Sequence, residues 1–262
     1  MRFKEFGNRG NAPTILLIHG LFVSWELFNP LVERLQGAYH IVVPMLDGHI
    51  YDDGKSEKSC FTTIDAAAQE IAAYLGSIGC DKVHLLYGIS LGGCLAARFT
   101  EMRAVPIENL VIDAGTILPY GKLFIEICAY YQAANCWCTY HFRRLYKVLF
   151  PSHYFRCVID EVAKTFPSGG VRTPINVYRS IFAYRLQHIS EDTKVAFWYG
   201  SKEAWVMKRC ADHLQTLRPD AAIEVFPRMQ HAQLIIDHPD AVADKIEIMS
   251  NTMKASSSNI NV

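Results

Sequence analysis

The sequence lacks an excess of charge of either sign, since 26 lysine and arginine residues balance 26 aspartate and glutamate residues among its 262. Proteins that bind nucleic acids usually carry a basic excess, so this balance argues against a nucleic-acid partner. The sequence also lacks a long uncharged apolar run. Its most apolar region, near 123–150, contains Glu126, Arg143, Arg144 and Lys147, and we therefore expect no membrane span.

We also expect neither a secretory leader nor a metal-binding cysteine pattern. The first residues, MRFKEFG, lack the apolar core of a signal peptide, which predicts a cytoplasmic protein. The eight cysteines are scattered, and none forms a C-x-x-C pair. We expect them to be free, buried thiols in a reducing compartment rather than disulfides or zinc ligands.

What the sequence does contain is a series of short apolar runs separated by helix-like segments. Because most runs are continuous rather than alternating, they are typical of parallel strands that are buried on both faces. Helices are expected at 29–35 and at about 63–79. The predicted strands are 15–18, 41–43, 83–87, 110–112, 195–199 and 223–226. This alternation predicts an α/β fold with a mostly parallel central sheet and helices on both faces.

The alternation stops between about 115 and 190, where no strand is expected and aromatic residues are dense. We interpret this segment as a helical cap inserted over the sheet. Most of its aromatic side chains are expected to pack the cap's own core, and a few to line a pocket beneath it. The predicted organisation is a core of residues 1–114 and 191–254, a cap of 115–190 and a disordered tail of 255–262.

The most informative motif is Gly88-Ile89-Ser90-Leu91-Gly92, which joins a predicted strand to the helix-like stretch 93–99. Strand, glycine-flanked turn and helix form the context of a nucleophile elbow, which strains the serine backbone and exposes the hydroxyl. A Cβ at the flanking glycines would collide with the neighbouring strand and helix. The helix begins just after Ser90, so its free N–H groups would face a developing oxyanion.

A serine hydroxyl needs a base to take its proton during attack, and a histidine on the loop after the last strand is expected to supply it. His231 follows the final apolar run and therefore falls at the carboxyl edge of the sheet. His84 lies within a predicted strand, and His238 precedes Pro239 near a helix start. These two are expected to be structural, which leaves His231 as the predicted base.

The imidazole in turn needs a carboxylate that fixes its tautomer and stabilises the imidazolium. Glu203 comes three residues after Gly200, on the loop that follows the strand 195–199, within reach of His231. Asp113, at the end of 110–112, is the alternative acid, because the order serine, acid, histidine holds for both. Glu203 is favoured, and Asp113 stays open.

An oxyanion also needs two preorganised N–H donors. One is expected from Leu91, directly after the serine. The other is expected from the turn His19-Gly20-Leu21-Phe22 that follows the first parallel strand. Gly20 lets the backbone turn close to the site, and the amide of Leu21, rather than that of Phe22, would donate.

Together these motifs resemble the α/β-hydrolase superfamily, in particular its capped serine hydrolases with esterase- or lipase-like members. The resemblance covers most of the chain outside the cap. It rests on His19-Gly20, Asp47-Gly48-His49, Gly88-Ile89-Ser90-Leu91-Gly92-Gly93, Gly200 to Glu203, and His231. From the residues alone, Asp47-Gly48-His49 is interpreted as a loop that packs the sheet edge.

The resemblance implies Ser90 as nucleophile, His231 as base, the amides of Leu21 and Leu91 as oxyanion donors, and a helical cap at about 115–190. Aspartate is commoner than glutamate at the acid position of this family, so Glu203 is a departure from its pattern. A serine at the elbow disfavours the epoxide-hydrolase and dehalogenase branches, which use aspartate there.

We therefore expect a serine hydrolase that cleaves a small, hydrophobic carboxylic ester through an acyl-enzyme intermediate and needs no metal or organic cofactor. The same residues would serve a thioesterase, an amidase, an acyltransferase or a C–C hydrolase. A non-catalytic ligand receptor on a hydrolase scaffold is the alternative from another class, because a fold does not fix a function. The sequence predicts no oligomeric state.

Overall fold

The computed structural model describes residues 1–10 and 12–257, with side chains to residue 250. Its centre is a seven-stranded sheet in which all neighbouring strands are parallel except the first pair, which is antiparallel. In spatial order the strands are β1 (Arg2–Phe6), β3 (His40–Met45), β2 (Thr14–Ile18), β6 (Val83–Ile89), β7 (Ile107–Asp113), β8 (Lys194–Gly200) and β9 (Ala222–Phe226). Every residue of β2 and β3 is buried, as continuous apolar runs predict for strands covered on both faces.

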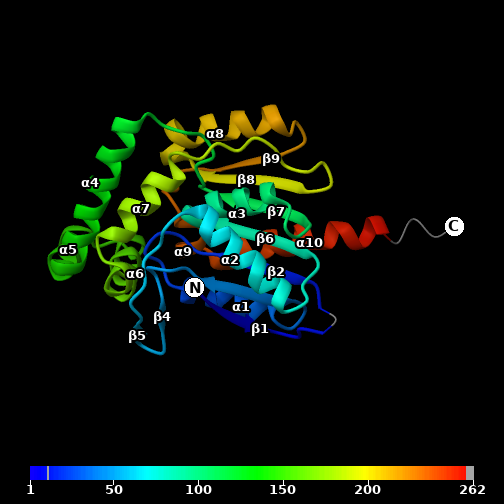
Figure 1. Ribbon diagram of the computed structural model, residues 1–262, viewed down its shortest axis with the longest axis horizontal. Helices are drawn as coiled ribbons and strands as arrows, with labels where there is room; N and C mark the ends of the chain where they lie inside the picture. Colours follow the sequence, from blue (N-terminus) through cyan, green and yellow to red (C-terminus); the bar gives the residue numbers. More distant parts are fainter. Residues whose placement is uncertain (11, 258–262) are drawn as a thin grey trace.

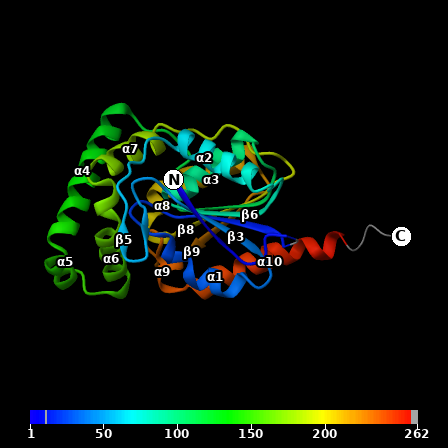
Figure 2. The ribbon, with the colours of Figure 1, turned by 60° about the horizontal axis from the view of Figure 1, so that its bottom comes forward.

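Helices cover both faces of this sheet (Figures 1 and 2). One face packs against α2 (Ile64–Ser77), α3 (Leu91–Met102) and α8 (Ala204–Leu217). The other face packs against α1 (Asn29–Leu35), α9 (Gln233–Asp237) and α10 (Pro239–Ser257). The fold class predicted from the alternation of strands and helices is therefore confirmed.

Between β7 and β8 the chain leaves the sheet and forms four helices. They are α4 (Lys122–His141), α5 (Arg143–Leu149), α6 (His153–Gly169) and α7 (Arg172–Ile181), called here the helical insertion. No strand forms in this fully described stretch, as its sequence predicts. Figures 1 and 2 both place the insertion at one end of the molecule, away from the end of α10.

Buried polar contacts fix the insertion to the core. The amide and hydroxyl of Ser24 both donate to Oε2 of Glu161 in α6, at 2.6 and 2.7 Å. Phe22 packs beside them, in a small apolar cluster with Cys136 and Phe166. The turn that follows β2 is thus held against the insertion by hydrogen bonds as well as by apolar contact.

Several short elements are absent from the sequence-based assignment. These are β1, the hairpin of β4 (Tyr51–Asp52) and β5 (Lys55–Ser56), and the 3-10 helices η1 (Trp25–Phe28) and η2 (Ser201–Glu203). Helix α10 continues through 255–257, the start of the predicted disordered tail, and the rest of that tail, 258–262, lies outside the described residues. All eight cysteines are free, as expected, but only Cys94, Cys136 and Cys210 are buried. In the described part of the chain, no helix combines the length and apolarity needed to cross a bilayer.

Candidate active site

Ser90 lies on the sharp turn between β6 and α3, with a positive φ of 56° and a ψ of −114°. Such a conformation is strained for a residue with a Cβ and persists only where the surroundings enforce it. Here the Ser90 amide donates to the carbonyl of Asp113 at 2.7 Å. A Cβ on Gly88 would lie 2.1 Å from the carbonyl oxygen of Gly92, and one on Gly92 would lie 2.1 Å from that of Ile18. The turn can therefore form only with glycine at both positions, as the motif predicts.

Three side chains that are distant in the sequence meet at this turn. The Ser90 hydroxyl lies 2.8 Å from Nε2 of His231, and Nδ1 of His231 lies 2.6 Å from Oε2 of Glu203. Because a carboxylate only accepts hydrogen bonds, Nδ1 must carry the proton, which leaves Nε2 as the acceptor for the hydroxyl. The imidazole is thus oriented by the carboxylate to take a proton from the serine.

The loops after β8 and β9 are tied together, which explains how Glu203 reaches His231. The amide of Lys202 donates to the carbonyl of Met229 at 3.1 Å. A Cβ on Gly200 would lie 2.3 Å from that same carbonyl oxygen, so the close approach requires glycine. The second oxygen of Glu203 accepts from the Gly200 amide at 3.2 Å, which fixes the carboxylate from behind.

The alternative acid occupies a different position. Asp113 is buried, and its Oδ2 accepts a hydrogen bond from the Tyr87 hydroxyl at 2.6 Å. Burial, helped by the charge of Glu203, outweighs the Tyr87 hydrogen bond and the nearby imidazole and raises the pKa of Asp113 to about 7. Within the described residues, Glu203 and not Asp113 hydrogen-bonds the imidazole of His231.

Charge around the imidazole favours its protonated form. Burial of His231 opposes the imidazolium, but the hydrogen bond and charge of Glu203, together with the charge of Asp113, outweigh it and raise the pKa of His231. An imidazolium formed beside Ser90 is therefore stabilised, as a transient proton acceptor requires.

Both predicted N–H donors lie beside Ser90. Leu91 is the first residue of α3, where an amide has no partner within the helix. A Cβ on Gly20 would lie 3.4 Å from Cβ of Ser90, so the turn after β2 passes directly next to the serine. Leu21 and Leu91 both line the cavity at Ser90.

The other histidines considered from the sequence make no hydrogen bond to Ser90 or Glu203 within the described residues. His19 is buried, and its Nε2 accepts from the Leu46 amide at 3.2 Å. His49 is buried beside it, with ring centroids 5.3 Å apart, and so belongs to the packed loop at the sheet edge. His84 is paired with Glu108 at 2.6 Å, at the opposite end of β6 from Ser90. His238 lies at the start of α10, next to Pro239.

Two cavities meet at Ser90 and His231. The larger, of about 420 Å³, has mostly apolar walls that include Tyr120, Phe124, Tyr131, Phe182, Trp205 and Met207. The smaller, of about 190 Å³, is lined by aliphatic side chains that include Leu21, Val23, Leu27, Val158 and Ile236. A site with two apolar compartments on either side of one hydroxyl can hold the two halves of a small molecule.

Side chains of the helical insertion also line the site. The sequence alone did not identify them as site residues. Gln132 of α4 and Tyr178 of α7 line both cavities. Tyr154 of α6 donates its hydroxyl to the carbonyl of His231 at 2.8 Å. In the sequence they are distinguished only by lying within an aromatic-rich segment, and this does not show which side chains face Ser90.

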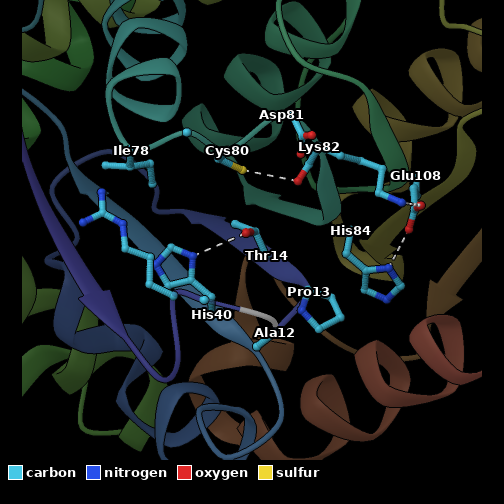
Figure 3. A pocket seen from close by; sticks show the side chains of 13 residues that line it. Ala12, Pro13, Thr14, His40, Ile78, Cys80, Asp81, Lys82, His84 and Glu108 are labelled. Atoms are coloured by element: carbon cyan, nitrogen blue, oxygen red, sulfur yellow. Dashed lines mark hydrogen bonds and ion pairs between the residues drawn. The ribbon is translucent and has the colours of Figure 1, made fainter.

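A third cavity, of about 320 Å³, lies at the opposite edge of the sheet (Figure 3). Its walls come from the amino ends of β2, β3 and β6. Figure 3 shows His40 facing Thr14 and the Glu108 carboxylate between Lys82 and His84. Ser90 follows the carboxyl end of β6, so this cavity is remote from it and does not belong to the candidate active site. Among the residues described, no group of histidine, cysteine, aspartate and glutamate side chains is arranged to hold a metal ion.

Comparison with known proteins identifies a matching family and more distant relatives. The model of the family described as "Alpha/beta hydrolase family" matches residues 15–245. An uncharacterized hydrolase of Saccharomyces cerevisiae is 31% identical over 122 residues, which are 45% of this chain and 40% of that protein. A monoacylglycerol lipase of Xenopus laevis is 27% identical over 125 residues, 46% of this chain and 36% of the lipase. The matched region thus spans well under two thirds of either relative.

The fold also matches a solved structure along nearly its whole length. An alpha/beta hydrolase family protein from Desulfitobacterium hafniense superposes with a TM-score of 0.78 at 19% identity. The match covers 95% of this chain and 99% of the other. At that identity the likeness concerns the architecture alone.

Proposed function

The chain belongs to the alpha/beta hydrolase family, and from this premise we propose that it is a serine hydrolase that cleaves small, uncharged carboxylic esters. The observation that carries the proposal is the continuous hydrogen-bond path from the Ser90 hydroxyl through His231 to Glu203. A structural role alone gives no reason for a strained serine at the floor of two cavities.

In the proposed mechanism, the Ser90 Oγ attacks the acyl carbon while its proton passes to Nε2 of His231. The amides of Leu21 and Leu91 donate to the oxyanion of the tetrahedral intermediate. The imidazolium, stabilised by Glu203, then gives its proton to the leaving alkoxide oxygen, and the acyl group stays on Ser90. Water then attacks the acyl carbon while His231 takes its proton, and a second tetrahedral intermediate forms. As this intermediate collapses to the free acid, the imidazolium returns the proton to Oγ of Ser90.

The cavity walls support an uncharged substrate. Among the described residues that line the two compartments, there is neither a lysine nor an arginine. A carboxylate on the substrate would be desolvated without a cation to pair with and would face the negative charge of Glu203. An ester with one larger flat or branched apolar group and one short aliphatic group fits the two unequal compartments. The name of one relative, a monoacylglycerol lipase, supports an ester bond as the target.

We also propose a cytoplasmic site of action. Eight free cysteines, five of them only partly buried, support it, because free thiols persist in reducing compartments.

Turnover of matched substrates tests the proposed function. The purified protein is offered p-nitrophenyl butyrate, the corresponding thioester and anilide, and p-nitrophenyl hydrogen succinate, which adds a carboxylate. We expect the fastest turnover with the neutral oxygen ester and a large loss of kcat/KM with the succinate. Saturable binding of the butyrate ester without turnover would favour a receptor and overturn the proposal. Preference for the thioester or anilide would replace the reaction class.

A further inference from the structure

The outer surface of the helical insertion exposes an unusual amount of apolar side chain. Among residues 1–10 and 12–250, fifteen large hydrophobic residues are exposed, and eleven of them lie between 123 and 150. We call the following set the apolar ridge: Leu123, Ile127, Tyr130, Trp137, Leu145, Val148 and Leu149. Folded proteins rarely leave contiguous apolar surface open to water, so a ridge of this kind indicates an interaction site.

The ridge follows from the sequence of α4, which is apolar on two opposite faces. Its inward face, represented by Ile125, Ala129 and Cys136, is buried. Its outward face repeats at helical spacing and holds Leu123, which is 77% exposed. Helix α5 continues the surface and has no buried residue at all. Figures 1 and 2 show α4 and α5 forming the extreme end of the molecule, with no other element outside them.

The charge of this surface is basic, although the whole chain is neutral. Helices α4 and α5 together contain Lys122, Arg143, Arg144 and Lys147 but only one carboxylate, Glu126. That carboxylate is already held by Arg179 of α7 at 2.6 Å, and Lys147 is paired with Asp160 of α6. Arg143 and Arg144 are exposed and form no ion pair within the described residues. Their charges are therefore available for an anionic partner.

The ridge is continuous with the mouth of the larger cavity at Ser90. Phe124 and Tyr131 of α4 lie next to ridge residues and line that cavity, while 44% and 70% of their surface stays exposed. Trp205, at the start of α8, lines the same cavity and is 79% exposed. A partner that covers the ridge would thus also lie against the entrance to the candidate active site.

We propose that α4 and α5 dock the protein onto the surface of an anionic lipid bilayer. The apolar ridge enters the boundary between headgroups and acyl chains, with its tyrosine and tryptophan at the polar interface, and Arg143 and Arg144 bind headgroup phosphates. A second copy of the chain fits less well, because a two-fold contact through this end would enclose the unpaired arginines of both copies, while the one carboxylate of α4 and α5 is already paired. Docking itself does not depend on catalysis. Delivery of lipid-like esters from the bilayer to Ser90 rests on the proposed function.

Flotation with vesicles tests the docking, using the full chain with Ser90→Ala so that no ester bond in the lipid is cut. One vesicle preparation contains phosphatidylcholine alone, and the other replaces part of it with phosphatidylglycerol. We expect binding to the anionic vesicles to exceed binding to the neutral ones by about tenfold or more, and to fall as salt screens the arginines. No binding to either preparation, or equal binding to both, would overturn the proposal.

Two variants and a control locate the surface. Arg143→Gln with Arg144→Gln should weaken anionic-vesicle binding by about fivefold for each cation removed. Leu123→Gln with Ile127→Gln, Val148→Gln and Leu149→Gln should weaken binding to both vesicle types by on the order of tenfold or more. Val225→Gln, the control, replaces an exposed apolar side chain of β9, outside the ridge, and should leave vesicle binding unchanged. Unchanged binding in the ridge variant, or an equal loss in the control, would overturn the assignment.

Activity and mass measurements separate this proposal from its rivals. None of the substituted ridge positions lines either cavity, so each variant in a Ser90 background should hydrolyse a water-soluble ester like the unsubstituted chain. Hydrolysis without vesicle binding would refute docking and leave the proposed function intact. Vesicle binding without hydrolysis would support docking and refute the proposed function. A dimer seen by light scattering, lost in the ridge variant and accompanied by no vesicle binding, would assign the ridge to self-association.

Discussion

The sheet core and the helical insertion use apolar residues in opposite ways. Leu86 of β6 is fully buried on the face of the sheet that α2 and α3 cover, whereas Leu123 of α4 is 77% exposed at the end of the molecule. Burial explains the centre of the core, because every side chain of β2 and β3 is buried by neighbours that exclude water. In the insertion, apolar residues close the cavities above Ser90 on the inside and remain uncovered on the outside. The core thus supports the site, and the insertion supplies the surfaces that a substrate or a membrane would meet.

The largest expected effect is a loss of activity on substitution of Ser90, which the sheet core positions. Ser90→Ala should lower kcat for a neutral ester by on the order of 10⁴-fold or more, because the attacking atom is lost. The free energy of unfolding should not fall, since the substitution removes a hydroxyl and leaves the strained turn in place. Steady-state kinetics and urea denaturation check the two parts. Substantial turnover by the folded variant would contradict the proposed role of Ser90.

The next effect separates the two candidate acids. Glu203→Gln should lower kcat by on the order of 10³-fold, because the imidazolium loses its hydrogen-bonded negative charge. Asp113→Asn, the matched control, should lower it by less than about tenfold, since its carboxyl is bound to Tyr87 rather than to His231. Kinetics of both variants with one ester decides between them. A larger loss for Asp113→Asn would reverse the assignment.

A stability measurement compares the two regions directly. Leu86→Ala should lower the free energy of unfolding by about 3 kcal/mol, because it leaves a cavity between sheet and helices. Leu123→Ala should change it by no more than about 0.5 kcal/mol, because its side chain already faces water. Urea denaturation of both variants checks this. Similar losses would mean that the ridge is covered by the protein itself.

The smallest expected effect is a displacement of the pH profile. His231 must be neutral to accept the serine proton, and its pKa is raised above the ordinary 6.5. The value of kcat/KM should therefore fall, as pH is lowered, through a midpoint above 6.5. In Glu203→Gln the raising influence of the carboxylate is lost and burial remains, so the midpoint should move to lower pH. An acidic limb at the same pH in both proteins would argue against His231 as the titrating base.

The strands of the core and the elbow could be predicted from the sequence because they depend on local patterns. The continuous apolar runs gave six of the seven sheet strands, and the glycines of the elbow are required by contacts that their spacing already implies. Strand β1 (Arg2–Phe6) was not predicted, because it is a half-exposed edge strand with mixed residues and no apolar run. The structure also brings Ser90, His231 and Glu203 into hydrogen-bond contact, while their catalytic roles stay predictions.

The insertion was less accessible to the same reasoning. Its sequence predicts helices and aromatic density, but a helix that is apolar on both faces does not tell which face packs inward. Gln132 and Tyr178 face the serine only because α4 and α7 pack against each other above it. The apolar ridge became visible only once the exposed fractions of Leu123 and Val148 were known. Tertiary packing, not local pattern, decides these positions.

In the proposed mechanism, the Ser90 hydroxyl is activated by the imidazole of His231, which comes from a distant loop. Peptide mass spectrometry after exposure of the folded protein to a fluorophosphonate tests it most directly. We expect one stoichiometric adduct, on Ser90, and a strongly reduced labelling rate in His231→Ala. Labelling at another residue, or an equal rate of labelling in that variant, would contradict it.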